Sequence, residues 1–273
     1  MTRAAEAGPQ VAASGEPEAI SIQLERDVAI GACLFAPRRG APVGAVLIGS
    51  AMGVRQSFYA PFAAWLAEQG YWVATFDYRG VGVSRRASGL RGFDADLFAW
   101  ARDTDAAIDA LAERAGDLPI YVIGHSLGAQ LPGLLRNRDR IAGLVSIAAG
   151  SGYWRDNAPR LKRSILYFWH VLVPVATALF GYFPGAKLRK VGDLPQGVIL
   201  QWRRWCLNPR YHVGAEGRAV REQFEAVRFP LVALSITDDE LMTEHGTQVL
   251  VDCYANAPRR VERVATGTST CQK

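Results

Sequence analysis

The chain has 273 residues, of which 49% are apolar and 21% charged, an ordinary composition for a globular protein large enough to bury a full core. Its net charge of +5 comes from scattered basic residues, and the densest basic runs (160–163 and 187–190) are too short for a nucleic-acid-binding arm. Four cysteines without C-x-x-C spacing argue against a disulfide framework or a zinc site and fit a reducing cytoplasm.

The first nineteen residues contain one early arginine but no apolar segment, so they do not have the pattern of a signal peptide. We expect residues 1–19 to form a short disordered tail, and we expect a cytoplasmic protein. We expect no nucleic-acid partner.

From residue 20 to residue 150, strand-like and helix-like segments alternate. Two short alternating runs over 20–37 predict an antiparallel pair at a sheet edge. Compact apolar runs predict further strands, and segments of helical spacing predict the helices between them. The expected strands are 45–50, 71–80, 118–124 and 141–150, and the expected helices are 59–70, 94–116 and 127–137. Continuous apolar strands separated by helices predict a mostly parallel, doubly wound α/β sheet covered on both faces.

The alternation stops at 151–228, a block that holds four of the seven tryptophans. It resumes with a strand and acidic turn at 229–240, a helix over 241–257 and a last strand over 259–265. We therefore predict an α/β core in two halves (20–150 and 229–273) with a helical cap (151–228) inserted between them.

Within the predicted cap, residues 164–186 carry no Asp, Glu, Lys or Arg, and this stretch is long enough to cross a membrane. It contains His170 and Pro174, however, and it sits between strands that must pair with one another. We expect a cap helix that is buried or faces a substrate. A membrane span and attachment to a membrane surface are the alternatives.

The sequence Gly124-His125-Ser126-Leu127-Gly128 is a G-x-S-x-G motif with an apolar strand before it and a helical segment after it. This context is the one in which a serine lies on a sharp strand-to-helix turn. Glycines are needed there because side chains two residues from the serine would clash. The helix N-terminus directs amide groups at any negative charge that develops beside the serine.

At this point the chain resembles the α/β-hydrolase superfamily. "GHSLG" matches its nucleophile elbow, "DYRGVGVS" (77–84) matches the turn after the neighbouring strand, and "SITDDE" (235–240) matches its acid turn. More closely, "GSAMGVRQSFYAPFA" (49–63) and "GYFPG" (181–185) look like uncharacterised bacterial α/β hydrolases described by similarity to serine aminopeptidases and monoacylglycerol-lipase-like enzymes. The resemblance implies an α/β-hydrolase fold, a mostly parallel doubly wound sheet with an inserted helical cap.

The resemblance implies that Ser126 is the nucleophile. The oxyanion hole would use the backbone N–H of Leu127 and a second N–H from the loop after strand 45–50, where Met52 is the first choice and Ala51 the next. The acid would be Asp238 or Asp239, and position in the chain slightly favours Asp238.

The triad histidine of this fold follows the last strand, but "TGTSTCQK" follows residue 265 and contains none. None of the chain's four histidines, His125, His170, His212 and His245, is expected to replace it. We therefore expect a truncated or frame-shifted C-terminus and a chain that lacks its general base.

The sequence thus predicts a serine hydrolase that cleaves an ester or small amide through an acyl-serine intermediate, with an apolar substrate group bound under the cap. The alternative is a catalytically impaired hydrolase-fold protein that binds a ligand or a membrane. No metal or organic cofactor is expected, and the sequence gives no oligomeric state.

Overall fold

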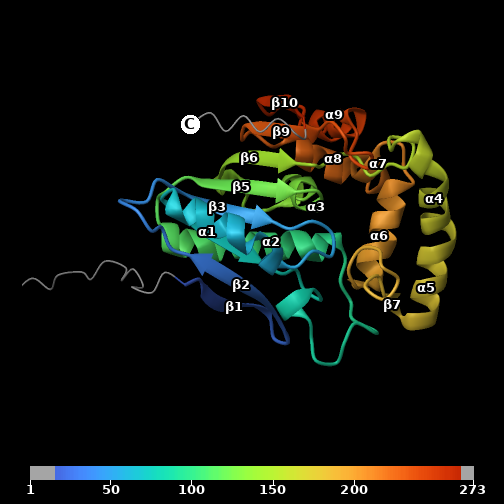
Figure 1. Ribbon diagram of the computed structural model, residues 1–273, viewed down its shortest axis with the longest axis horizontal. Helices are drawn as coiled ribbons and strands as arrows, with labels where there is room; N and C mark the ends of the chain where they lie inside the picture. The colour runs from blue at the N-terminus through green and yellow to red at the C-terminus, as the bar shows by residue number, and fades with distance from the viewer. Residues whose placement is uncertain (1–15, 266–273) are drawn as a thin grey trace, which may run out of the picture.

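An eight-stranded sheet forms the centre of the molecule, with strand order β1-β2-β4-β3-β5-β6-β9-β10 (Figure 1). The computed structural model describes residues 16–265. Every neighbouring pair from β4 to β10 is parallel, whereas β2 is antiparallel to both β1 and β4. This confirms the mostly parallel sheet and the antiparallel pair at its edge. The strands are β1 (Glu18–Glu25), β2 (Val28–Phe35), β3 (Gly44–Gly49), β4 (Tyr71–Phe76), β5 (Ile120–His125), β6 (Ile141–Ile147), β9 (Leu231–Ile236) and β10 (Arg259–Val264).

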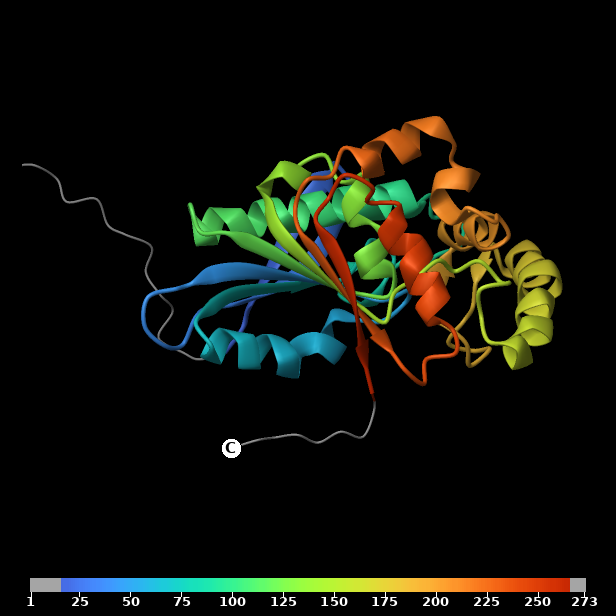
Figure 2. The same ribbon diagram turned by 90° about the horizontal axis from the view of Figure 1, so that it is seen from above.

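Helices cover the two faces of the sheet unequally (Figure 2). One face packs against α2 (Leu97–Ala115), α3 (Leu127–Gln130), α8 (Arg218–Glu225) and α9 (Glu244–Asp252) in a large apolar core. On the other face a smaller core forms under α1 (Ala60–Glu68). Beyond α1, alternate residues of β6 and β9 on this face, such as Val145 and Leu234, stay partly exposed. Within residues 16–265 this half of the face carries no covering helix.

Local sequence explains where the central helices begin and end. The carboxylate of Asp96 accepts a hydrogen bond of 2.6 Å from the Ala99 amide and caps α2, which ends at Gly116. The helix expected over 127–137 begins at Leu127 as predicted but is much shorter than expected. Helix α3 ends at Gln130 because Pro132 has no amide hydrogen to continue the ladder, and a short 3-10 turn over 132–134 follows.

Strand β1 begins inside the segment expected to be a disordered tail. Glu18 pairs with Leu34 of β2, so the ladder with β2 orders the end of that segment. The part of the expected tail before residue 16 lies outside the described residues.

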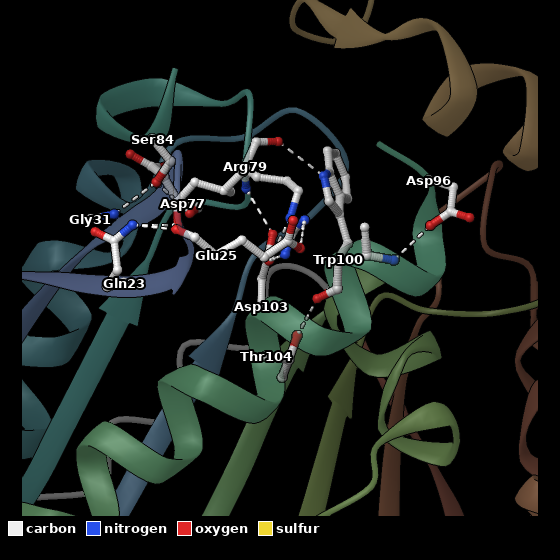
Figure 3. Close-up of polar contacts among 12 residues, drawn as sticks. Gln23, Glu25, Gly31, Asp77, Arg79, Ser84, Asp96, Trp100, Asp103 and Thr104 are labelled. Atoms are coloured by element: carbon white, nitrogen blue, oxygen red, sulfur yellow. Dashed lines mark hydrogen bonds and ion pairs between the residues drawn. The ribbon is translucent and has the colours of Figure 1, made fainter. Parts of the chain in front are cut away.

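A buried ion pair holds the turn after β4 to helix α2 (Figure 3). The backbone N–H and the Nε of Arg79 each donate a hydrogen bond of 2.8 Å to the carboxylate of Asp103, which has no exposed side-chain area. Glu25 of β1 binds the same guanidinium at 3.1 Å, and the Trp100 indole donates to the Arg79 carbonyl. These contacts fix the "DYRGVGVS" turn against the helix.

Between β6 and β9 the chain builds five helices, and the four before α8 lie beyond the carboxyl ends of the central strands (Figure 1). A continuous helical segment runs from residue 159 to residue 180, with a π turn over 168–172 between α4 and α5. Among the described residues it is the one helix long and apolar enough to cross a membrane, yet only 22% of its apolar window is buried. The elements are α4 (Lys162–Tyr167), α5 (Val173–Phe180), α6 (Gln196–Cys206), α7 (Tyr211–Ala215) and α8, with the short pair β7 (Tyr182–Phe183) and β8 (Leu194–Pro195).

Candidate active site

Ser126 occupies the sharp turn between β5 and α3. Its backbone has φ 51° and ψ −113°, a conformation that L-residues with a side chain rarely adopt. Two hydrogen bonds hold the turn, from the Ser126 amide to the Ile147 carbonyl at 3.0 Å and from the Ala129 amide to the Ser126 carbonyl at 3.1 Å. The turn therefore pushes the serine side chain out at the carboxyl end of the sheet.

The glycines of the motif are required by close backbone packing. A Cβ at Gly124 would lie 2.4 Å from the Ala129 amide nitrogen, and a Cβ at Gly128 would lie 2.1 Å from the Gly49 carbonyl oxygen. Strand β3 thus passes directly against the turn. A larger residue at Gly128 would force β3 and α3 apart, and a larger residue at Gly124 would force β5 and α3 apart.

Ser126 lines a cavity of about 560 Å³ between the sheet and the cap. Its apolar wall comes mainly from the cap: Leu161, Ile165, Phe168, Trp169, Val191 and Trp202. The cavity can hold an acyl chain or aryl group next to the serine.

Ala51 and Met52, the two expected sources of an oxyanion-hole amide, also line this cavity. The Ala51 amide donates a hydrogen bond of 2.9 Å to Tyr59 Oη and is therefore occupied. Within residues 16–265, the amides of Met52 and Leu127 donate no hydrogen bond. These two amides are the ones available to an oxyanion.

Of the two expected acids, Asp239 lines the cavity, whereas Asp238 is not among its lining residues. The Asp239 carboxylate accepts hydrogen bonds from the amides of Leu241 (2.9 Å) and Met242 (2.8 Å). Asn157, also a lining residue, donates to the Leu241 carbonyl at 2.6 Å. The first turn of the cap segment therefore holds the acid loop in place.

His125 lines the same cavity as Ser126, and its Nδ1 lies 2.9 Å from Tyr59 Oη. Burial lowers the pKa of His125, and the charge of Asp239 offsets part of this shift. The tautomer of the imidazole decides the direction of this bond: either Tyr59 Oη donates to Nδ1, or the Nδ1–H donates to Oη, which can accept it beside the Ala51 N–H.

The other three histidines lie away from the serine. His170 is exposed, and His245 is exposed with Nε2 3.6 Å from Asp156. His212 is fully buried, neither ring nitrogen has a hydrogen-bond partner, and burial lowers its pKa to about 3. Within residues 16–265, no histidine is hydrogen bonded to Ser126 Oγ. The stretch after Ala265, where the sequence lacks the expected histidine, lies outside the described residues.

Sequence reasoning missed Tyr59 and Asn157. Tyr59 lies within "GSAMGVRQSFYAPFA", the segment that carried the closer resemblance. That resemblance could have pointed to Tyr59 as a site residue. Asn157 stands in a segment without periodicity, and no pattern pointed to it. No cluster of His, Cys, Asp or Glu in residues 16–265 could hold a metal ion, and Cys33, Cys206 and Cys253 are free thiols.

The sequence profile of the serine aminopeptidase S33 family matches residues 40–196, more than half of the chain. The lysophosphatidylserine lipase ABHD12 of Gallus gallus is 41% identical over 63 residues, and that of Danio rerio is 39% identical over 66 residues. Each match covers 23% of this chain and 15% of the relative. The likeness to these lipases is therefore confined to a small part of their length.

Solved structures with the same fold match nearly the whole chain. A soluble variant of monoglyceride lipase from Saccharomyces cerevisiae covers 94% of this chain and 88% of its own, with a TM-score of 0.68 and 16% identity. A carboxyl esterase from Bacillus coagulans covers 91% and 89%, with a TM-score of 0.62 and 17% identity. Taken with the strand order, the serine turn and the family match, these likenesses show that the chain belongs to the serine aminopeptidase S33 family of α/β hydrolases.

Proposed function

We propose that this hydrolase is a serine hydrolase that cleaves an ester, or a small amide, bearing an apolar group. The observation that carries the proposal is the geometry at Ser126. A serine in a strained backbone conformation lines an apolar cavity together with Met52, and the amides of Met52 and of Leu127, the residue after the serine, donate no hydrogen bond within residues 16–265.

In the proposed reaction, Ser126 Oγ attacks the substrate carbonyl carbon and gives its proton to a base. The carbonyl oxygen becomes an oxyanion, which the Met52 and Leu127 amides stabilise by hydrogen bonds. The intermediate then collapses, and the alcohol or amine leaves with a proton. Water attacks the acyl-Ser126 ester in the same way and releases the acid.

Asp239 is the proposed acid, because it lines the cavity while Asp238 does not. Within residues 16–265, no histidine is hydrogen bonded to Ser126 and able to act as its general base. In this fold the base follows the last strand, which is β10 here. A positioned general base contributes about 10²- to 10⁴-fold to the rate, so we expect slow turnover if no base reaches Ser126.

The aromatic and aliphatic cap wall supports an acyl or aryl group as the bound part of the substrate. The names of the similar proteins, a monoglyceride lipase, a carboxyl esterase and a lysophosphatidylserine lipase, support an ester over an amide. The free thiols support a cytoplasmic location for this activity.

The test is turnover of a series of p-nitrophenyl esters of increasing acyl length by the wild-type chain and by Ser126→Ala. Ser164→Ala is the matched control, because Ser164 lines the same cavity from the cap side. We expect Ser126→Ala to abolish turnover and Ser164→Ala to retain it. Equal turnover in the wild-type and Ser126→Ala proteins would remove Ser126 from the mechanism.

The second candidate is a hydrolase-fold protein that binds a ligand without turning it over. The absence, within residues 16–265, of a histidine bonded to Ser126 favours it. A fluorophosphonate probe separates the two candidates, because it reacts with an activated serine and leaves an inactive one unlabelled.

A further inference from the structure

The outer face of α4 and α5 is a continuous apolar stripe. Tyr167, Val171, Val175 and Leu179 recur at intervals of four residues, which places them on one side of the helix. Their exposed fractions are 58%, 45%, 51% and 67%. A row of large apolar side chains on a helix normally faces the core of the protein, so the exposure of this stripe requires an explanation.

The opposite side of the same helix is fixed to the protein. Trp169, Val173 and Ala176 are buried, and the Trp169 carbonyl accepts a hydrogen bond of 2.5 Å from Arg203 of α6. Ile165 and Phe168 line the cavity that contains Ser126. The helix is therefore the wall of the cavity on one side and the outermost element of the molecule on the other (Figures 1 and 2).

All the charged residues in and around this helix, over 158–192, are basic. Residues 158–192 contain no Asp or Glu, and their six Lys and Arg residues lie in two groups, one before the stripe and one after it. Arg160 is paired with Glu240. Within residues 16–265 the other five form no ion pair: Lys162, Arg163, Lys187, Arg189 and Lys190.

We propose that this stripe, Tyr167, Val171, Val175 and Leu179 with the basic groups at its two ends, docks on the surface of an anionic lipid bilayer. The helix lies in the plane of the interface, with its apolar side chains among the outer parts of the acyl chains and its basic side chains among the headgroups. Tyr167 lies near one end of the stripe and Tyr182 just beyond the other, at the depth that tyrosine prefers in membranes.

Several observations favour a lipid surface over other partners. The stripe runs along one helix and consists of three aliphatic side chains and one tyrosine, whereas protein interfaces are built around aromatic and arginine anchors that fill pockets. Uncompensated basic residues at both ends complement anionic headgroups. A membrane span is disfavoured because crossing would extract Trp169 and Val173 from the core and would remove the wall of the cavity.

The proposal stands independently of the chemistry at Ser126, although docking would bring the cavity wall to the lipid surface. The first measurement is flotation with vesicles of phosphatidylcholine alone and of phosphatidylcholine with phosphatidylglycerol. We expect the wild-type chain and Ser126→Ala to float equally well with the anionic vesicles, so failure of the proposed function would leave this result unchanged.

The decisive variant is Val175→Glu/Leu179→Glu, which places two carboxylates on the stripe. Its matched control is Phe58→Glu/Trp65→Glu on and beside α1, where Phe58 is 68% exposed against 67% for Leu179. We expect a loss of binding of roughly tenfold or more in the stripe variant and none in the control. Lys187→Glu/Lys190→Glu should weaken binding to the anionic vesicles and remove its dependence on salt.

Circular dichroism and the melting temperature verify that each variant is folded. The proposal is overturned if the folded wild-type chain does not bind anionic vesicles, or if the stripe variant binds as well as the control. Resistance to extraction by carbonate would indicate a span in place of surface docking. A dimer in solution that Leu179→Glu separates into monomers would show that a second copy covers the stripe, and it would also overturn the proposal.

Discussion

Tyr59 Oη lies 2.9 Å from His125 Nδ1 and accepts a hydrogen bond of 2.9 Å from the backbone N–H of Ala51. One phenol therefore joins the residue before the proposed nucleophile to the loop that supplies the proposed oxyanion-hole amide of Met52. The same bond occupies the Ala51 amide. Tyr59 is 6% exposed, so these hydrogen bonds form where water does not compete freely.

Replacing Tyr59 with Phe tests this connection. The Ala51 amide would lose its partner in a buried site, which costs about 1–3 kcal/mol. We expect a lower melting temperature and a fall in ester kcat of about tenfold, since a displaced oxyanion donor costs less than the 10²- to 10³-fold of a deleted one. Tyr167→Phe, at an exposed tyrosine of the cap, is the control. Unchanged kcat in Tyr59→Phe would show that the bond does not position the loop.

The backbone at Ser126 predicts a difference between two substitutions that both remove the hydroxyl. Glycine adopts a positive φ without strain, whereas alanine retains the cost of about 1–3 kcal/mol that such a conformation imposes. We expect Ser126→Gly to be more stable than Ser126→Ala, with both inactive toward esters. Urea denaturation of the two variants measures the difference. A less stable glycine variant would mean that the turn imposes no strain at this residue.

His212 predicts how stability changes with pH. Its pKa is about 3 in the folded protein because it is fully buried, and near 6.5 in the unfolded chain. Below pH 6.5 the unfolded state binds a proton that the folded state does not bind. Stability is therefore lost as the pH falls from about 6.5 toward 3, by roughly 1.4 kcal/mol per pH unit. His212→Leu removes this dependence and two unpaired buried nitrogens.

The measurement is the free energy of unfolding between pH 7 and pH 4 for the wild-type chain, His212→Leu and the exposed control His170→Gln. The leucine variant should show the shallower pH dependence, while the control follows the wild type. Parallel curves for all three proteins would mean that His212 titrates normally in the fold.

The ion pair between Arg79 and Asp103 predicts a large loss of stability when one partner is neutralised. Asp103→Asn leaves a buried guanidinium without its main countercharge, which costs about 3–5 kcal/mol. Glu18→Gln removes the exposed pair with Arg114 and should cost about 1 kcal/mol or less. Thermal unfolding of both variants gives the comparison. Losses of equal size would contradict the structural role of the buried pair.

The sheet and the serine turn could be predicted because they rest on local signals. Apolar runs mark the strands, and glycine is required at 128 because a Cβ there would lie 2.1 Å from the Gly49 carbonyl oxygen of β3. The helix expected over 127–137 is much shorter in the structure. The apolar residues have helical spacing, but Pro132 cannot donate the next hydrogen bond of the helix.

The long-range parts of the site could not be predicted. Tyr59 and His125 are separated by 66 positions, and Asn157 and Leu241 by 84, so no periodicity links either pair. Which carboxylate of the acid turn reaches the cavity also depends on how the loop is folded by the amides of Leu241 and Met242. The exposed stripe of α4 and α5 has the same composition as a buried helix, and only its packing shows which side faces the solvent.

The most direct test of the central proposal is to locate the adduct of a fluorophosphonate probe by mass spectrometry of peptides. We predict a single stoichiometric adduct on the peptide that contains Ser126, formed slowly, unchanged in Ser164→Ala and absent from Ser126→Ala. An adduct on another serine, or ester turnover that persists in a folded Ser126→Ala protein, would contradict it.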